Sequence, residues 1–272
     1  MDVFSPGRHI GLGGDTGGAN WSFAGGLFGQ GSDEIDDAKD FETADNEGYG
    51  LVARATFAPI NRDGAVLHFG ASARRGTPDS ETDKSDGVSD VVRYRTRAET
   101  TISKVRFLDT GRVLGVDWID SYGIEAAASL GPVTFQSEYT GTHLDRSGSP
   151  SADFQSANLS GYYGQIAWLI TGEAPAYRGR EGEFGRITPS RKSGAWELAY
   201  RYSGIDLDDA GADIEGGTSV QQTFGLNWHA NSAVKVMFNY SLVENGVNAD
   251  ADGDTDGDEH FSFLQLRCQV SL

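Results

Sequence analysis

Apolar and polar residues alternate most regularly between positions 219 and 243. The first half carries an apolar residue at every second position except Gln222, and a polar turn at 229–233 precedes a second alternating run. The apolar positions are Val220, Phe224, Leu226, Trp228, Val234, Val236, Phe238, Tyr240 and Leu242. Because neighbouring side chains of a strand point to opposite faces, the pattern predicts a hairpin of two strands with one apolar and one polar face.

The same unit repeats along the chain and predicts thirteen strands and no helix. They are expected at residues 8–13, 19–30, 48–59, 65–74, 91–100, 105–116, 122–131, 133–141, 159–171, 195–203, 219–229, 234–243 and 263–272. Short turns alternate with long loops, as in outer-membrane barrels, where strands of about 9–11 residues cross at a tilt. We therefore predict an all-β fold, a transmembrane antiparallel up-and-down β-barrel, as a single domain over residues 1–272.

Aromatic residues on the apolar faces distinguish this barrel from a soluble β-sandwich. Tryptophans fall near the short turns and tyrosines towards the opposite end. The expected membrane girdles are Trp21, Trp168, Trp196 and Trp228 at one end, and Tyr49, Tyr122, Tyr162, Tyr202 and Tyr240 at the other. Membrane barrels carry aromatic belts at both interfaces, whereas a sandwich core has no reason to sort tryptophan from tyrosine by end.

Composition and charge narrow the possible classes further. The chain has 272 residues and a net charge of −18, which argues against nucleic acid as a partner. It contains no run of about 18 apolar residues, so a transmembrane helix is excluded. The acidic residues gather in four loop-like stretches, at 31–46, 76–90, 206–215 and 244–259. The connection at 172–193 is polar with several basic residues, namely Arg178, Arg180, Arg186, Arg191 and Lys192.

The start of the chain, MDVFSPGRHIG, lacks the basic and apolar regions of a signal peptide. Either the protein is cytoplasmic or the front of the gene product is missing. Cys268 is the single cysteine, so no intrachain disulfide forms, and we expect it to fill apolar space.

The polar faces of the predicted strands would line a lumen that carries more basic than acidic residues. The basic residues are Arg54, Arg74, Arg93, Arg95, Arg97, Arg201, Lys235 and Arg267, and the acidic ones are Glu99, Glu125, Glu138 and Glu197. A basic lumen favours anions, since a narrow low-dielectric pore focuses the field. Arginines two apart on one strand lie about 7 Å apart and can pass an anion along by forked hydrogen bonds. In the alternative interpretation, these charges pair with the glutamates and stiffen the wall.

The sequence contains few signs of a metal site or of a catalytic site. Asp252, Asp254 and Asp256 open like a calcium loop, but its twelfth position is Phe263 where glutamate is needed, so a plain solvated loop is the alternative. The histidines have no metal-ligand spacing, and no nucleophile, phosphate loop or catalytic carboxylate pair is present. We therefore expect no enzyme activity and no cofactor.

Several long blocks resemble the phosphate-selective porin O and P family. They are GRHIGLG, WSFAGGLFGQ, LDTGRV, YGIEAAASLGPVTFQSEY, GYYGQIAWLITGE, FGRITPSRKSGAWELAYRYSGIDL and FGLNWHANSAVKVMFNYSLV. The resemblance covers residues 7–272 and implies a sixteen-stranded, homotrimeric porin in the outer membrane of a Gram-negative bacterium. Its arginine-lined lumens would pass phosphate, polyphosphate or other anions. The thirteen strands would be the last thirteen of the sixteen, without the first three strands and the signal peptide.

The resemblance also assigns particular residues, with departures from the family pattern. The arginine ladder of the family carries over onto Arg93, Arg95 and Arg97. The loop after Gln30 is implied to narrow the pore, but Lys39 is its one lysine among seven acidic residues, which weakens phosphate as the specific ligand. The final residue is Leu272, where outer-membrane barrels usually end in an aromatic residue.

The hypothesis from the sequence is a passive outer-membrane channel for inorganic anions, in contact with lipid and lipopolysaccharide. Two alternatives stay open. One is a surface barrel that binds a ligand or divalent cations through its acidic loops, and the other is a soluble all-β binding domain.

Overall fold

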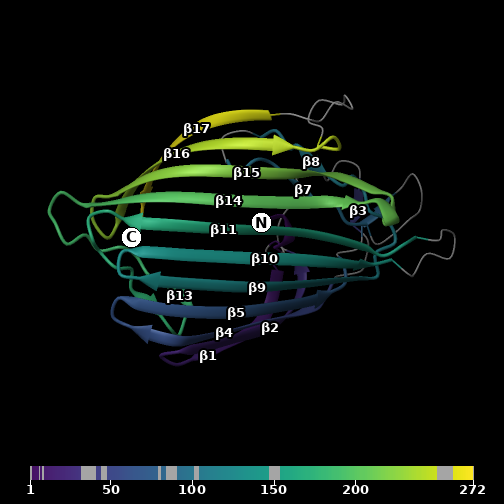
Figure 1. The fold of residues 1–272 in the computed structure, drawn as a ribbon. Helices are drawn as coiled ribbons and strands as arrows, with labels where there is room; N and C mark the ends of the chain where they lie inside the picture. The colour runs from purple at the N-terminus through teal and green to yellow at the C-terminus, as the bar shows by residue number, and fades with distance from the viewer. Residues whose placement is uncertain are drawn as a thin grey trace.

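A computed structural model shows one large, curved antiparallel sheet (Figure 1). It describes residues 2–5, 7, 9–31, 41–43, 48–78, 81–83, 91–100, 104–146, 154–249 and 260–271. The sheet has eleven strands: β1 (His9–Gly17), β2 (Trp21–Gly31), β4 (Gly50–Arg62), β5 (Ala65–Gly76), β9 (Trp118–Leu130), β10 (Val133–Asp145), β11 (Ala157–Leu169), β14 (Ala195–Asp209), β15 (Ile214–His229), β16 (Val234–Asn245) and β17 (His260–Val270). No helix among the described residues is long and apolar enough to cross a membrane.

The strands pair in chain order, from β1 at one edge of the sheet to β17 at the other. This order confirms the predicted up-and-down meander. The sheet is open, because β1 pairs only with β2 and β17 only with β16 among the described residues. Most connections are short at one end of the strands, which we call the turn end, where residues 170–194 are the exception, and most are longer at the other, the loop end (Figure 1).

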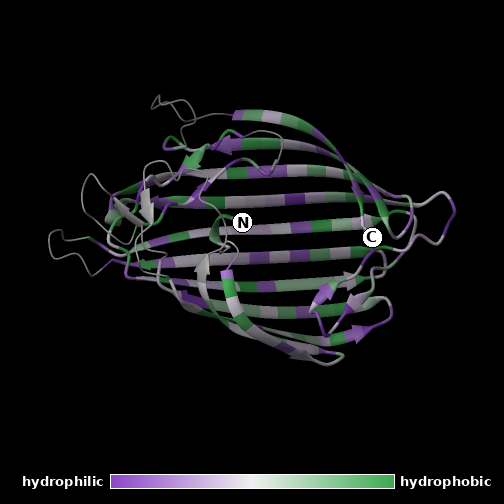
Figure 2. Ribbon diagram, turned by 180° about the vertical axis from the view of Figure 1, so that it is seen from behind, coloured by the Kyte–Doolittle hydropathy of each residue, from purple (hydrophilic) through white to green (hydrophobic). Residues whose placement is uncertain are grey.

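Alternation along the strands separates an exposed apolar face from a covered polar face (Figure 2). On β15, Phe224 is 47 % exposed and Gln221 is 5 % exposed. The apolar side chains point outwards from the convex side of the sheet, whereas the polar side chains point to its concave side. The hairpin predicted from the sequence is confirmed, with Phe224 opposite Tyr240 in the register of β15 and β16.

The aromatic residues lie at the ends expected from the sequence. Trp196 and Trp228 stack with ring centres 6.2 Å apart near the turn end, where Trp21 starts β2 and Trp168 nearly ends β11. Two tyrosine pairs lie towards the loop end, Tyr122 with Tyr139 and Tyr162 with Tyr202, each with ring centres 6.1 Å apart. Contact of these rings with a membrane interface stays a prediction.

The strands predicted at 91–100 and 105–116 are wrong as wall strands, so the wall has eleven strands and not thirteen. These residues form only a short ribbon of β7 (Arg95–Thr96) and β8 (Leu108–Asp109), with a bridge between Val92 and Val113. The physical reason is that their apolar side chains are buried against the concave side of the wall. Leu108 and Val113 are each 2 % exposed, whereas the outward side chains of a wall strand are exposed.

Two other short ribbons lie outside the large sheet. They are β3 (Phe41–Thr43) with β6 (Glu81–Asp83), and β12 (Tyr177–Arg178) with β13 (Glu183–Phe184). The first strand is also longer than predicted, since β1 continues to Gly17 instead of ending at residue 13. A glycine-rich edge strand fits because the backbones approach closely: a Cβ on Gly11 would lie 2.4 Å from the carbonyl oxygen of Leu27.

The main apolar core lies on the concave side near the loop end. It contains Phe4, Leu108, Val113, Val116, Ile119, Leu144, Ala157, Leu159, Leu207, Ala212, Ile214 and Ala249. The 3-10 turns η1 (Asp2–Phe4) and η2 (Ala210–Ala212) both contribute to it. This core joins the chain's first residues and the segment after β5 to the inner wall.

Candidate functional site

Two segments fold onto the concave, polar side of the sheet. We call residues 91–100 and 104–117 the loop-end segment and residues 170–194 the turn-end segment. The first contacts the wall through Glu99, whose carboxylate accepts hydrogen bonds from Arg201 on β14 at 3.1–3.3 Å. The second contacts it through Tyr177, whose hydroxyl lies 2.6 Å from Nδ1 of His68 on β5. Both segments therefore narrow the space that the polar wall encloses.

Arg146, at the end of β10, joins the loop-end segment to neighbouring loops. Its guanidinium donates to the carbonyl oxygens of Leu114 at 2.9 Å, Ala212 at 3.1 Å and Gln155 at 3.3 Å. The residue is only 6 % exposed. Burial lowers the pKa of Arg146 from its usual value, and the charge of Asp213 acts in the opposite direction. Because this buried cation binds three carbonyl oxygens from separate parts of the chain, it holds the loop-end segment in place against the neighbouring loops.

The three arginines of the predicted ladder lie on the loop-end segment and not on a wall strand. Arg93 forms a two-pronged ion pair with Asp109, with N–O distances of 2.7 and 2.5 Å. Arg95 is half-buried on β7, and Arg97 is exposed beside the inner face of β14 and β15. Tyr94, between Arg93 and Arg95, is half-buried, and desolvation raises its pKa to about 12 although Arg74 acts to lower it. Arg93 is thus held by an acidic partner within the segment itself.

A connected set of polar groups attaches the turn-end segment to the wall. Arg54 on β4 pairs with Glu125 on β9 at 2.5 Å and donates to the carbonyl oxygens of Glu181 at 3.3 Å and Gly182 at 3.1 Å. Nε2 of His68 lies 2.9 Å from the same carboxylate of Glu125. Arg54 was predicted as part of an anion path. The structure shows that it also positions a segment of the chain.

Inside the turn-end segment, Glu173 is a buried hydrogen-bond acceptor. It accepts from Thr171, from the Ser190 amide at 3.0 Å and from the Ser190 hydroxyl at 2.7 Å. Burial acts to raise the pKa of Glu173, but these hydrogen bonds outweigh it and lower the pKa to about 2. The carboxylate therefore links the two ends of the turn-end segment, because its partners are Thr171 and Ser190.

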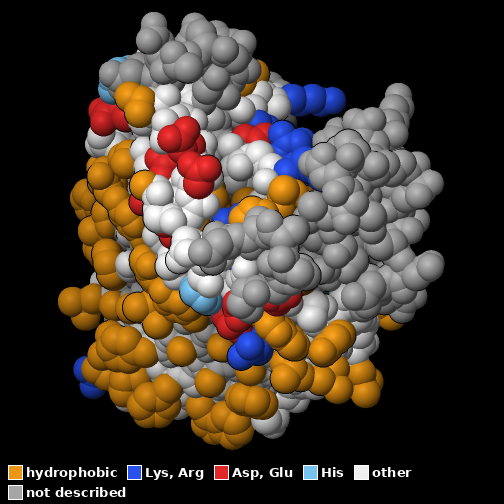
Figure 3. All heavy atoms as spheres, turned by 90° about the vertical axis from the view of Figure 1, so that its right-hand side faces the viewer, with side chains coloured by type: hydrophobic (Ala, Val, Ile, Leu, Met, Phe, Trp, Pro, Cys, Tyr) orange, Lys and Arg blue, Asp and Glu red, His pale blue; other side chains and the backbone are white. Residues whose placement is uncertain are grey.

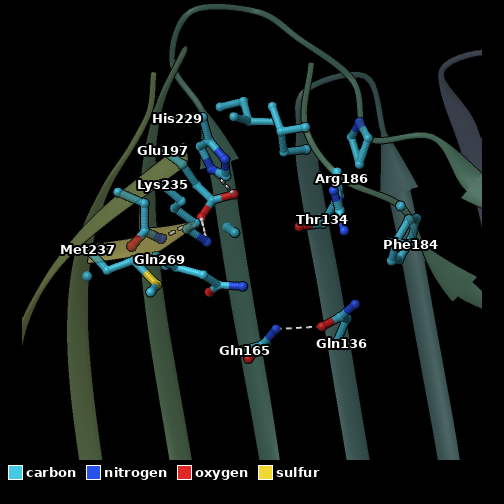
Figure 4. Close-up of a pocket in the computed structure, with 18 of the residues that line it drawn as sticks. Thr134, Gln136, Gln165, Phe184, Arg186, Glu197, His229, Lys235, Met237 and Gln269 are labelled. Carbon is cyan, nitrogen blue, oxygen red and sulfur yellow. Dashed lines mark hydrogen bonds and ion pairs between the residues drawn. The ribbon is translucent and has the colours of Figure 1, made fainter. Parts of the chain in front are cut away.

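A cavity of about 460 Å³ lies between the turn-end segment and strands β10, β11 and β14–β17 (Figure 4). Arg186 and Phe184 reach it from the segment, and Lys235 reaches it from the wall. Lys235 lies 3.7 Å from a carboxylate oxygen of Glu197, which also accepts a hydrogen bond from Asn227 at 2.5 Å. Within the described part of the chain, Arg186 has no acidic partner. The lining of the cavity therefore contains charges of both signs beside apolar side chains such as Phe184.

The structure places the predicted site residues unequally. Arg54, Arg74, Arg201 and Lys235 lie on the concave face of the wall. Lys39 and the calcium candidates Asp252, Asp254 and Asp256 lie outside the described residues. No group of three or more His, Cys, Asp or Glu able to hold a metal ion occurs among the residues that are described.

Sequence reasoning missed the role of the turn-end segment. It identified the basic residues of 172–193 but treated the stretch only as a connection. The available signal was its length, because the other connections at this end are short turns such as 63–64 and 131–132. The loop after Gln30, implied to constrict the pore, is largely outside the described residues. In the structure, the loop-end segment lies on the concave side, where the loop after Gln30 was expected.

Seen from the loop end, apolar side chains form the outer rim and charged ones of both signs gather inside (Figure 3). A curved antiparallel wall, apolar outside and charged inside, with two segments folded inwards, is the arrangement expected of the porin class.

The comparisons with known proteins agree with this class. The chain matches the family described as phosphate-selective porin O and P over residues 1–272, and it belongs to that family. It is similar to Porin O of Pseudomonas aeruginosa, with 29 % identity over 251 residues. That match covers 84 % of this chain and 55 % of the relative, so the chain spans about half the length of the relative.

Proposed function

We propose that this chain is part of a passive anion channel in the outer membrane of a Gram-negative bacterium, with phosphate or polyphosphate among its solutes. Membership of a porin family supports the channel, and the name of that family supports phosphate. Solutes would diffuse down their gradients through the space on the concave side. The protein would need no cofactor and no turnover.

The observation that carries anion preference is the charge of the two inward segments. The loop-end segment has six basic and three acidic residues, and the turn-end segment has five basic and three acidic residues, although the whole chain has a net charge of −18. Both segments contact the inner wall. A cationic excess in a narrow space of low dielectric raises the local concentration of anions and excludes cations.

Ion pairs reduce the number of cations that act on a passing solute. Among the described residues, the pairs on the concave side include Arg54 with Glu125, Arg93 with Asp109, Arg201 with Glu99, and Lys235 with Glu197. Of the described basic residues that line the cavity or the adjoining wall of β16 and β17, Arg186 and Arg267 have no acidic partner. We therefore assign much of the selectivity to these two arginines. The paired arginines hold the segments and keep spare N–H donors for an anion.

The convex face would contact lipid and lipopolysaccharide, with Trp21, Trp168, Trp196 and Trp228 at one interface. The tyrosines Tyr49, Tyr122, Tyr162, Tyr202 and Tyr240 would lie towards the other interface. Assembly as a homotrimer belongs to the same proposal.

Charge reversal tests the proposal. We expect the double variant Arg186→Glu, Arg267→Glu in planar bilayers to shift the zero-current potential in a KCl gradient towards the potassium side. Arg62→Glu, at the turn-end tip of β4, is the matched control, because it changes the charge outside the cavity. An unchanged potential in the double variant would remove these two arginines from the selectivity mechanism.

A further inference from the structure

The cavity beside the turn-end segment differs from a site made for a bare inorganic anion. Such a site would gather cations and exclude carboxylates. Here Glu197 lies on the wall of the cavity with Lys235, whereas Arg186 reaches in from the opposite side (Figure 4). The carboxylate repels an anion at one position, and the guanidinium attracts one at another. A ligand that fits both must combine an anionic group with a neutral polar part.

Side-chain amides add to the polar surface. Five strands contribute one amide each, namely Gln136, Gln165, Asn227, Asn239 and Gln269, and Asn231 in the turn between β15 and β16 adds a sixth. Each amide offers two donors and an acceptor, which suits hydroxyl groups that donate and accept at the same time. Gln165 donates to Gln136 at 2.5 Å, so this pair presents a pre-ordered edge to the cavity.

His229 adds an unsatisfied group to the same wall. The residue is 7 % exposed, and its Nε2 atom has no hydrogen-bond partner. The nearest carboxylate oxygen, on Glu197, is 3.7 Å away, which is beyond hydrogen-bond distance. Buried polar atoms in proteins are nearly always hydrogen-bonded, so this atom, held only by its ion pair with Glu197, is a position where a small side-chain shift would let a polar ligand group bind.

The size of the cavity agrees with an organic ligand. Its volume of about 460 Å³ lies within the range of roughly 300–1,000 Å³ that is usual for small-molecule pockets. Phe184 provides an apolar surface at its edge. Orthophosphate alone would contact only part of this lining.

We propose that this cavity is a binding station for phosphorylated sugars or polyols on their way through the channel. The phosphate binds Arg186 in forked geometry, and the hydroxylated body binds the amides, Glu197 and His229. The inference rests on the proposed channel function, and it extends the solutes from inorganic phosphate to phosphate esters of small polyols.

Current block in planar bilayers tests the inference with three probes: glucose 6-phosphate, orthophosphate and glucose. We expect glucose 6-phosphate to half-block the chloride current at a concentration about tenfold lower than orthophosphate. Glucose should not block at comparable concentrations, because it lacks the anion for Arg186. Equal or weaker block by glucose 6-phosphate than by orthophosphate would overturn the inference.

Variants of the cavity residues test whether the ligand that blocks the current binds in this cavity. Asn239→Ala with Gln269→Ala should bring the ratio of the two half-blocking concentrations close to one, because the contacts to hydroxyl groups are lost. Arg186→Gln should weaken block by both phosphates. Arg178→Gln is the matched control, because Arg178 lies on the same segment, pairs with Glu183 and does not line the cavity. A control variant that loses the preference as fully as the amide variant would contradict the assignment.

A binding measurement without current separates this inference from the proposed function. Saturation-transfer NMR of glucose 6-phosphate on the purified protein in detergent should show contact at the sugar protons, and the amide variant should reduce it. Binding without anion current would overturn the channel and keep the cavity. Anion current without sugar contact would keep the channel and overturn the phosphate-ester site.

Discussion

The two inward segments are held against the same wall by different physical forces. The loop-end segment buries Leu108, Val113 and Val116 at 2 %, 2 % and 0 % exposure. The turn-end segment depends on polar contacts, in which Arg54 and Glu125 keep side-chain exposures of 37 % and 24 %. Apolar burial is not weakened by ionic screening, whereas partly exposed ion pairs are. We expect the loop-end segment to be a fixed constriction and the turn-end segment an adjustable one.

The largest expected effect comes from truncating the apolar contact. Leu108→Ala should lower the free energy of unfolding by about 2–5 kcal/mol, because it removes buried methyl groups and leaves a cavity. Urea unfolding in lipid vesicles measures the loss, and single-channel current should become noisier. Val105→Ala is the control, because Val105 lies on the same segment but is 44 % exposed. Equal losses in the two variants would mean that this segment is not held by its core.

Removing the buried cation should have the next largest effect. Arg146→Gln leaves the carbonyl oxygens of Leu114 and Ala212 without their guanidinium donor. Hydrogen bonds to charged groups contribute about 1.5–3 kcal/mol, so we expect a loss of about 2 kcal/mol in the free energy of unfolding. The loss should be the same in low and high salt. If the loss in the free energy of unfolding disappeared in high salt, Arg146 would not be acting as a buried hydrogen-bond donor.

A smaller effect is expected at the polar attachment of the turn-end segment. Glu125→Gln removes the charge that Arg54 and His68 share, at a cost of about 0.5–1 kcal/mol typical of partly exposed pairs. Its effect on single-channel conductance should decrease as salt rises, unlike that of Leu108→Ala. Asp120→Asn is the matched control, because Asp120 pairs with Arg75 at 3.6 Å and contacts neither inward segment. The comparison fails if both acidic variants change conductance alike.

The last effect concerns pH and appears only in acid. The pKa of Glu173 is lowered from 4.5 to about 2, so its contribution to stability is present above pH 4.5 and is lost as pH falls from there towards 2. We expect conductance to change over that interval as the segment loosens. Glu173→Gln should flatten this part of the pH profile. An identical profile in the variant would show that Glu173 does not hold the segment.

The wall could be predicted from the sequence because each strand is indicated by the alternation of a few consecutive residues. Alternation of Phe224, Leu226 and Trp228 with polar neighbours states both the strand and its outward face. The same rule failed for the loop-end segment, where Arg93, Arg95 and Arg97 alternate like the polar face of a strand. Period two indicates extended backbone, but it does not say whether that backbone joins the wall or packs inside it.

The site was less predictable because its contacts join distant residues. Arg54 and Glu181, or His68 and Tyr177, are more than a hundred positions apart in the chain. No spacing rule brings them together. Arg54, Arg74, Arg201 and Lys235 lie on the concave face of the wall, but Arg93, Arg95 and Arg97 do not lie on a wall strand. The glutamates Glu99, Glu125 and Glu197 could be named from the sequence as possible partners, but which basic residue each one pairs with follows only from the fold.

The zero-current potential of the protein in a planar bilayer across a KCl gradient tests the central claim most directly. We predict a zero-current potential whose sign indicates chloride selectivity. This potential should move towards zero when phosphate is added, because phosphate then occupies the concave side. We also predict a weaker preference in Arg186→Glu, Arg267→Glu. A potential on the potassium side would contradict the central claim and assign selectivity to the acidic stretches of the chain.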